Sequence, residues 1–104
     1  MQLEFRHGGT VMRVDGDVIE IFGPLGSSHR YLLPALRVEV QPSTKGTLAV
    51  YSTSAPAEWP LYELYAKPRY KRGEVEAYIP VEDEPFYRQF FTQVAQLCGR
   101  SVVA

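Results

Sequence analysis

The spacing of apolar residues changes once along this chain of 104 residues, near residue 84. Before that point, apolar and polar residues alternate in short runs, as they do in residues 3–6, and such runs are typical of half-buried β-strands. After it, apolar residues recur at Phe86, Phe90, Val94 and Leu97, which predicts one stripe of an amphipathic helix. The chain is therefore expected to be mainly β, with a sheet whose apolar face is closed by a C-terminal helix.

Turn residues divide the first 80 positions into about seven antiparallel strands. Gly8-Gly9 and Asp15-Gly16 predict two-residue hairpin turns, the second of type I′, because glycine tolerates positive φ. The segment 29–41 contains Pro34, which cannot donate to a ladder, so it is either one bent edge strand or two strands. The last two predicted strands of the chain, 61–66 and 74–80, are expected to pair as a hairpin. The predicted strands cover residues 2–7, 10–15, 17–22, 29–41, 47–52, 61–66 and 74–80.

The helix is predicted over residues 84–98. Asp83 or Glu84 can cap its start, Pro85 suits its first turn, and Gly99 is the expected stop. The apolar stripe is joined on its flank by Tyr87, Phe91 and Cys98.

Charge and composition exclude several classes of protein. Eleven basic and twelve acidic residues leave a net charge of −1, so the whole surface is not a nucleic-acid footprint. One cysteine excludes an intramolecular disulfide and a cysteine-based zinc site. No apolar run approaches the length of a membrane span, and the N-terminus lacks the apolar stretch of a signal peptide. We expect a single cytoplasmic domain over residues 1–104, with no cofactor and no metal.

This order of elements resembles the pleckstrin-homology-like (PH-like) superfold, which includes small bacterial domains. The resemblance covers essentially the whole chain and rests on element order, not on a diagnostic motif. It implies a roll or barrel of about seven antiparallel strands capped by the C-terminal helix. Helices of such domains often carry a tryptophan, whereas Trp59 lies in a predicted loop here. The basic signature of phosphoinositide-binding members around the first hairpin is absent.

A basic segment between the last two predicted strands is the first candidate site. Arginine and lysine can hold phosphate oxygens, and tyrosine can stack on a base or lie at a lipid headgroup. The resemblance implies that this segment shares a rim with the loops at 8–9 and 23–28. Alternatively, it is a solvated hairpin tip whose cations pair with Glu63, Glu74 and Glu76. The candidate ligand-binding residues are Lys67, Arg69, Tyr70, Lys71 and Arg72.

Aromatic residues suggest a second candidate. The chain has seven tyrosines, and both faces of the predicted strand 61–66 are partly apolar. Tyrosine is enriched at interfaces, although antiparallel sheets also favour it. Trp59, Tyr62 and Tyr65 are therefore candidate interface residues, covered by another protein or by a second copy of the chain.

Catalytic patterns are weak, and no catalytic residue is assigned. His7 and His29 lack metal-ligand spacing. Ser28 and His29 point to opposite faces of a strand, which is poor geometry for activating a nucleophile. Cys98 fits a small buried hydrophobe. The favoured hypothesis is a non-catalytic module that binds a protein or self-associates. Binding of a phosphorylated lipid headgroup or nucleic acid at 67–72 is the alternative, and a small hydrolase using His29 is a distant one.

Overall fold

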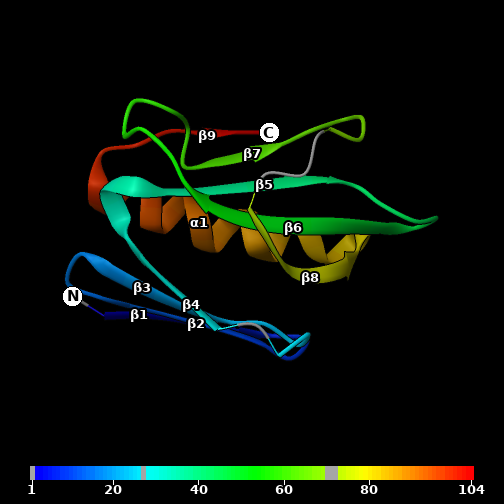
Figure 1. Ribbon diagram of the computed structural model, residues 1–104, viewed down its shortest axis with the longest axis horizontal. Coiled ribbons are helices and arrows are strands. Elements are labelled where there is room, and N and C mark those ends of the chain that lie inside the picture. The colour runs from blue at the N-terminus through cyan, green and yellow to red at the C-terminus, as the bar shows by residue number, and fades with distance from the viewer. Residues whose placement is uncertain (1, 27, 70–72) are drawn as a thin grey trace.

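The computed structural model describes residues 2–26, 28–69 and 73–104, which form two β-sheets and one long helix (Figure 1). The first sheet is an antiparallel meander in which strand order follows chain order. Alternation along each strand turns one face inward, with Phe5, Met12 and Ile21 among its buried side chains. The strands are β1 (Gln2–His7), β2 (Thr10–Asp15), β3 (Val18–Phe22) and β4 (Ser28–Leu32).

The turn between β2 and β3 differs from the predicted one. Asp15 pairs with Val18, so the turn residues are Gly16 and Asp17. Gly16 has a φ of 64°, and no non-glycine residue within the described ranges has a positive φ. A type I′ turn requires positive φ at both central positions. The predicted turn type is therefore wrong, and the return strand begins one residue later than predicted.

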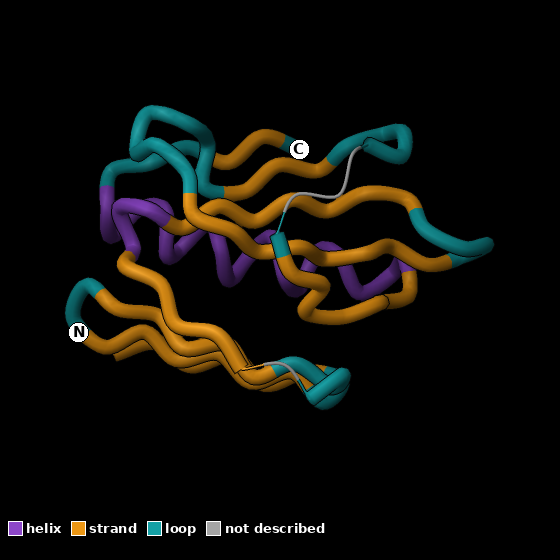
Figure 2. The backbone as a smooth tube through the Cα atoms, viewed as in Figure 1, coloured by secondary structure: helices purple, strands orange, loops and turns teal. Residues whose placement is uncertain are grey.

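The segment 29–41 is two strands, one in each sheet. Pro34 lies in a short 3₁₀ turn, η1 (Leu33–Ala35), between β4 and β5 (Leu36–Pro42). Proline suits such a turn because its φ is fixed and it has no N–H to pair in a ladder. Figure 2 shows the chain leaving the first sheet and entering the second through this turn.

The second sheet has five strands in the order β8-β6-β5-β7-β9. Strand β7 runs parallel to β5, and β9 runs parallel to β7. The predicted hairpin between 61–66 and 74–80 is therefore wrong, because β7 and β8 lie on opposite sides of the β5–β6 hairpin. The other four strands of this sheet are β6 (Thr47–Ser54), β7 (Tyr62–Leu64), β8 (Glu74–Pro80) and β9 (Val102–Val103).

The connection after β6 explains this arrangement. The N–H of Ala55 donates to the carbonyl oxygen of Ala35 at 2.8 Å, and the N–H of Val38 donates to that of Leu61 at 2.7 Å. The Leu61 side chain is fully buried. The chain thus turns back over the start of β5 and places β7 along its free edge, so that Leu61 reaches the core.

The mainly β class and the C-terminal helix are confirmed, whereas a single roll of seven antiparallel strands is wrong. The described residues form nine strands in two sheets, and two of the strand pairs are parallel. One hydrophobic core joins the inner faces of both sheets to the helix, with members from Phe5 to Ala95. The two sheets do not close into a barrel, and the helix covers the part of the core that the sheets leave open.

The helix α1 (Glu84–Cys98) confirms the predicted bounds and packs between the two sheets (Figure 1). Phe5 of β1 lies 4.7 Å from Tyr87 and 5.2 Å from Phe90 between ring centroids, whereas Tyr62 of β7 stacks on Phe91 at 5.4 Å. Because both sheets contact the helix, its buried side is centred near Tyr87 and Phe91, which were predicted on the flank of the apolar stripe. Phe86 and Leu97, which were predicted in the stripe, are 53% and 42% exposed.

The helix ends as predicted but begins differently. Gly99 forms the C-cap with a φ of 66°. Asp83 occupies the N-cap position, yet its backbone is already helical because the 3₁₀ turn η2 (Val81–Asp83) leads directly into α1. Its carboxylate makes no capping hydrogen bond and instead lies 3.0 Å from Nε2 of His7, which stacks on Phe86.

Candidate functional site

The outer face of β5 is buried although its residues are polar. Arg37, Glu39 and Gln41 are at most 4% exposed. They point away from the core, because Val38 and Val40 between them lie in it. Charged side chains are seldom buried without partners. The segments that follow β6 and β7 cover this face and supply those partners.

Arg37 is the centre of this buried polar network. Its Nη1 donates to the carbonyl oxygen of Pro60 at 2.8 Å, and its Nη2 donates to Oε1 of Glu63 and to the hydroxyl of Tyr65, each at 2.8 Å. Its guanidinium also lies 5.4 Å from the ring centroid of Trp59. One buried cation therefore holds the connection after β6 and the end of β7 in fixed positions.

The described part of the basic segment is anchored to the same face. The N–H of Arg69 donates to Oε1 of Gln41 at 2.6 Å, and its guanidinium lies 4.4 Å from the centroid of the Tyr65 ring. Lys67 and Arg69 are both exposed. Burial is the largest influence on Tyr65 and raises the pKa of its hydroxyl, as does the nearby carboxylate of Glu39. The predicted residues Tyr70, Lys71 and Arg72 lie outside the described residues.

Tyr62 is a core residue, so its assignment to an exposed interface is corrected. Its side chain is fully buried and stacks on Phe91. Its hydroxyl donates to Oε2 of Glu84 at 2.6 Å. Burial and this hydrogen bond raise the pKa of Tyr62 well above the usual range. The short strand β7 turns Tyr62 inward because its pairing with β5 places it beside the core residue Val38.

The other predicted interface residues remain accessible. Trp59 is 38% exposed, and Tyr65 is half-buried. Two tyrosines outside the predicted interface set lie on the same sheet: half-buried Tyr51 on β6, which pairs with Glu39, and Tyr78 on β8, which is 51% exposed. The interaction with Tyr78 contributes, after burial, to the raised pKa of Tyr51. We call Tyr51, Trp59, Tyr65, Arg69 and Tyr78 the outer aromatic face.

A polar cluster lies where the two sheets approach each other. Nδ1 of His29 on β4 is 2.7 Å from Oε1 of Glu76 on β8, within ion-pair distance. The hydroxyl of Ser52 on β6 also bonds to Glu76, and the hydroxyl of Tyr31 lies 2.9 Å from Ser52 Oγ. Burial raises the pKa of Tyr31. These contacts join β4 of the first sheet to β6 and β8 of the second.

The serine hydroxyl in this cluster is buried. The hydroxyl beside the carboxylate belongs to Ser52, whose side chain is fully buried and contacts Glu76 instead of the imidazole. A cavity of about 10 Å³ next to Ser52 and Glu76 has room for about one water molecule. The hydroxyl of Ser52 is therefore enclosed, and its contact with Glu76 joins β6 to β8.

Alternation of residues along the strand could not identify Glu76 as a buried residue. In the sequence, Glu74, Glu76 and Tyr78 alternate with Val75, Ala77 and Ile79, so a regular strand would place Glu76 on the same face as Tyr78. Val50 of β6 pairs with Ala77 of β8, whereas the next residue, Tyr51, pairs with Val75, so Glu76 is the extra residue of a β-bulge in β8. Glu76 and Ala77 are therefore both buried. A bulge adds one residue to one strand and redirects its side chains. The position of the bulge depends on how β8 pairs with β6, and the local sequence of β8 does not contain this information.

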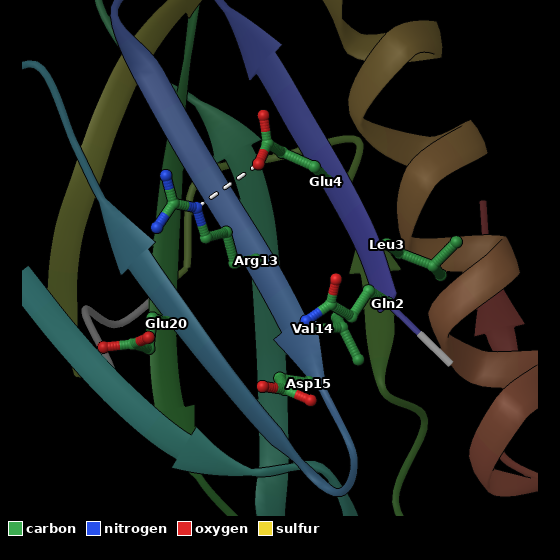
Figure 3. A pocket seen from close by; sticks show the side chains of 7 residues that line it. All are labelled: Gln2, Leu3, Glu4, Arg13, Val14, Asp15 and Glu20. Atoms are coloured by element: carbon green, nitrogen blue, oxygen red, sulfur yellow. Dashed lines mark hydrogen bonds and ion pairs between the residues drawn. The ribbon is translucent and has the colours of Figure 1, made fainter.

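The first sheet carries a shallow hollow on its outer face (Figure 3). It has a volume of about 490 Å³ and lies around Arg13, whose Nε is 3.3 Å from Oε2 of Glu4. Asp15 and Glu20 also line it. Its mixed charges and open shape fit a solvated sheet face better than a small-molecule site.

The described residues contain no group of three or more side chains placed to hold a metal ion. Cys98 is half-buried, and its thiol donates to the carbonyl oxygen of Val94 at 3.4 Å. Within the same part of the chain, no helix has the length and apolar character needed to cross a membrane.

The chain matches no protein-family model, and comparisons with curated proteins and with solved structures give no match.

Proposed function

We propose that this chain is a non-catalytic interaction module that binds a protein partner through the outer aromatic face. The observation that carries the proposal is the buried Arg37, which holds Tyr65 and the Pro60 carbonyl while Trp59 stays accessible. A few residues supply most of the binding energy at protein interfaces, and tryptophan, tyrosine and arginine are enriched among them. Side chains that are already held in place lose less entropy when a partner binds.

The charges beside this face indicate the chemistry of the partner. Lys67 and Arg69 are exposed, and the acidic residues of the face, Glu39 and Glu63, are already engaged by Arg37. A partner with acidic residues around an apolar centre complements this arrangement. Such charge complementarity accelerates association and makes it sensitive to salt.

The PH-like resemblance is part of this proposal. It is supported by the order of the described elements, in which eight strands of the two sheets precede a single long helix. A fold does not define a function, so the proposal rests on the outer aromatic face.

The second candidate is a phosphorylated ligand at the basic segment. The observation in its favour is that Arg69 lies against the Tyr65 ring, with exposed Lys67 nearby in the chain. A guanidinium held against a ring can still offer N–H groups to phosphate oxygens.

A photo-crosslinking residue in place of Tyr78 tests the first candidate, with the same residue in place of Leu32 as control. Leu32 is similarly exposed but lies on the first sheet. We expect a protein from the native host to crosslink at position 78 and not at 32. Trp59→Ala and Arg69→Ala should each weaken its binding at least about tenfold, because interface aromatic and arginine residues are frequent hot spots.

The matched controls for these affinities are Leu32→Ala and Arg30→Ala, which should change binding less than about twofold. Equal losses from the face and control variants would contradict the proposal. Salt-sensitive binding of the wild type to vesicles containing phosphatidylserine, lost in Arg69→Glu, would instead support the phosphorylated-ligand candidate.

A further inference from the structure

At one end of the first sheet, strand β1 has a free edge. Among the described strands, β1 pairs only with β2. In an antiparallel pair, successive residues alternately point their backbone N–H and C=O toward the partner strand and away from it. The two-residue turn at 8–9 closes on the hydrogen-bonded pair His7–Thr10. The residues of β1 whose backbone groups point away from β2 are therefore Gln2, Glu4 and Arg6.

This edge carries the charged side chains of Glu4 and Arg6, but it has no proline and no bulge to block pairing. Natural edge strands are commonly blocked by proline, by a bulge, or by a covering helix or loop. Strand β1 contains no proline, and its register with β2 is continuous over all six residues. Such an edge can accept another strand.

There is room beside β1 on both faces of the sheet. On the outer face, the hollow of about 490 Å³ reaches Gln2, Leu3 and Glu4 (Figure 3). Toward the helix, a groove of about 300 Å³ runs beside β1, with Arg6 of the strand and Phe86 of α1 among its lining residues. The helix therefore covers the inner face of β1 without closing its edge.

The outer face of this sheet carries a row of alternating charges. Glu4 is opposite Arg13, Arg13 is opposite Glu20, and Glu20 is opposite Arg30, one residue from each strand. The Arg13–Glu4 pair measures 3.3 Å and the Arg30–Glu20 pair 2.9 Å between nitrogen and oxygen. The row ends at β1 with Glu4, whose other contact is Arg6 of its own strand at 2.6 Å.

We infer that a second copy of this chain pairs with β1, antiparallel and related by a two-fold axis at Phe5. In this register Glu4 lies opposite Arg6 of the second copy, and Arg6 lies opposite Glu4 of the second copy. Both residues have outward backbone groups, so each pair exchanges two backbone hydrogen bonds. The alternating row then continues across the interface from Arg30, Glu20, Arg13 and Glu4 to a further arginine.

Charge selects this register over its neighbours. Outward groups can meet only if the two strands shift by two residues at a time. A shift of two residues in one direction places Glu4 opposite Glu4 of the second copy, and a shift in the other direction places Arg6 opposite Arg6. Like charges directly opposite each other on neighbouring strands are unfavourable. The same register places Phe5 opposite Phe5 on the inner face, with Leu3 opposite His7.

Charge reversal tests the pairing by sedimentation velocity from about 10 μM to about 1 mM, a range that detects weak association. The wild type should show a concentration-dependent dimer. Glu4→Arg and Arg6→Glu should each weaken dimerisation at least about tenfold, because each change acts twice in a two-fold dimer. The double variant restores opposite charges and should dimerise within about threefold of the wild type. Arg30→Glu, in the same row but on β4 at the opposite edge of the sheet, is the matched control and should leave dimerisation through β1 unchanged.

A wild type that stays monomeric over this range, or a double variant no better than the single ones, would overturn the inference. Hydrogen exchange of the wild-type protein gives a second measurement that does not depend on the folding of any variant. The backbone amides of Glu4 and Arg6 should exchange more slowly as concentration rises, whereas that of Arg30 should not change. Equal exchange at all concentrations would also overturn it. Partner binding at Tyr78 is measured separately, so failure of one proposal does not imply failure of the other.

Discussion

Glu76 shows how much one buried carboxylate contributes to the joining of two sheets. It is 2% exposed, and it contacts His29 on one strand and Ser52 on another. A buried charge is strongly unfavourable unless ion pairs and hydrogen bonds compensate it. The contacts of Glu76 compensate its burial and at the same time fix the position of β4 relative to β8.

Glu76→Ala should lower the free energy of unfolding by about 1–3 kcal/mol, because it removes the partner of a buried hydroxyl and of an imidazole. Urea denaturation measures this loss. Glu74→Ala, two residues earlier on the same strand and exposed, is the control and should change stability by less than about 0.5 kcal/mol. Equal effects of the two substitutions would show that the inward turn at the bulge is unimportant for stability.

The helix α1 is the element that most depends on its surroundings. One sheet alone would require a single apolar stripe, whereas two sheets require a wider arc that includes Tyr87, Phe90 and Phe91. The same arrangement buries Glu84 at the first turn, where the Tyr62 hydroxyl and Arg88 compensate its charge. The exposed Phe86 instead stacks on His7.

Two phenylalanines of α1 make a matched comparison. Phe91→Ala should destabilise the protein by about 3–5 kcal/mol, because it empties a fully packed site in the core. Phe86→Ala should cost less than about 1 kcal/mol, because that side chain is more than half exposed. Thermal or urea unfolding separates the two values. A larger loss at Phe86 would mean that the helix packs through the originally predicted stripe.

At the scale of the whole molecule, buried tyrosines make the stability of the fold depend on pH. Burial raises the pKa of Tyr31, Tyr62, Tyr65 and Tyr87. These residues stay protonated in the folded protein at a pH at which they ionise in the unfolded chain. The unfolded chain then binds fewer protons than the folded one, so the free energy of unfolding falls as pH rises.

The loss of stability should therefore begin near pH 10, the usual pKa of tyrosine, and continue as pH rises toward the higher folded values. Each tyrosine that ionises only in the unfolded chain contributes about 1.4 kcal/mol per pH unit. Urea denaturation between about pH 8 and 11.5 measures the slope. Tyr62→Phe should be less stable at neutral pH, where it loses its bond to Glu84, but should show a shallower slope. A flat profile in the wild type would contradict this account.

Local patterns in the sequence predicted the strands of the first sheet, the bounds of the helix and its stop at Gly99. These features depend on contacts between near neighbours in the chain, such as the turn at 8–9 and the apolar spacing after residue 84. Exposed Trp59, in a predicted loop, and half-buried Tyr65, in the predicted strand 61–66, could likewise be proposed as interface residues from their residue type. The mainly β class and the number of basic and acidic groups were also available without a structure.

Only the tertiary structure decided the parallel addition of β7 to β5, the burial of Tyr62 and the inward turn of Glu76. Each depends on a strand that is remote in the sequence, and the same local pattern is compatible with either face and either partner. The network around Arg37 is of the same kind, because the loops that bury it return from other strands. The sequence by itself therefore determined which segments become strands or helix, while the pairing of distant strands decided which side chains reach the surface.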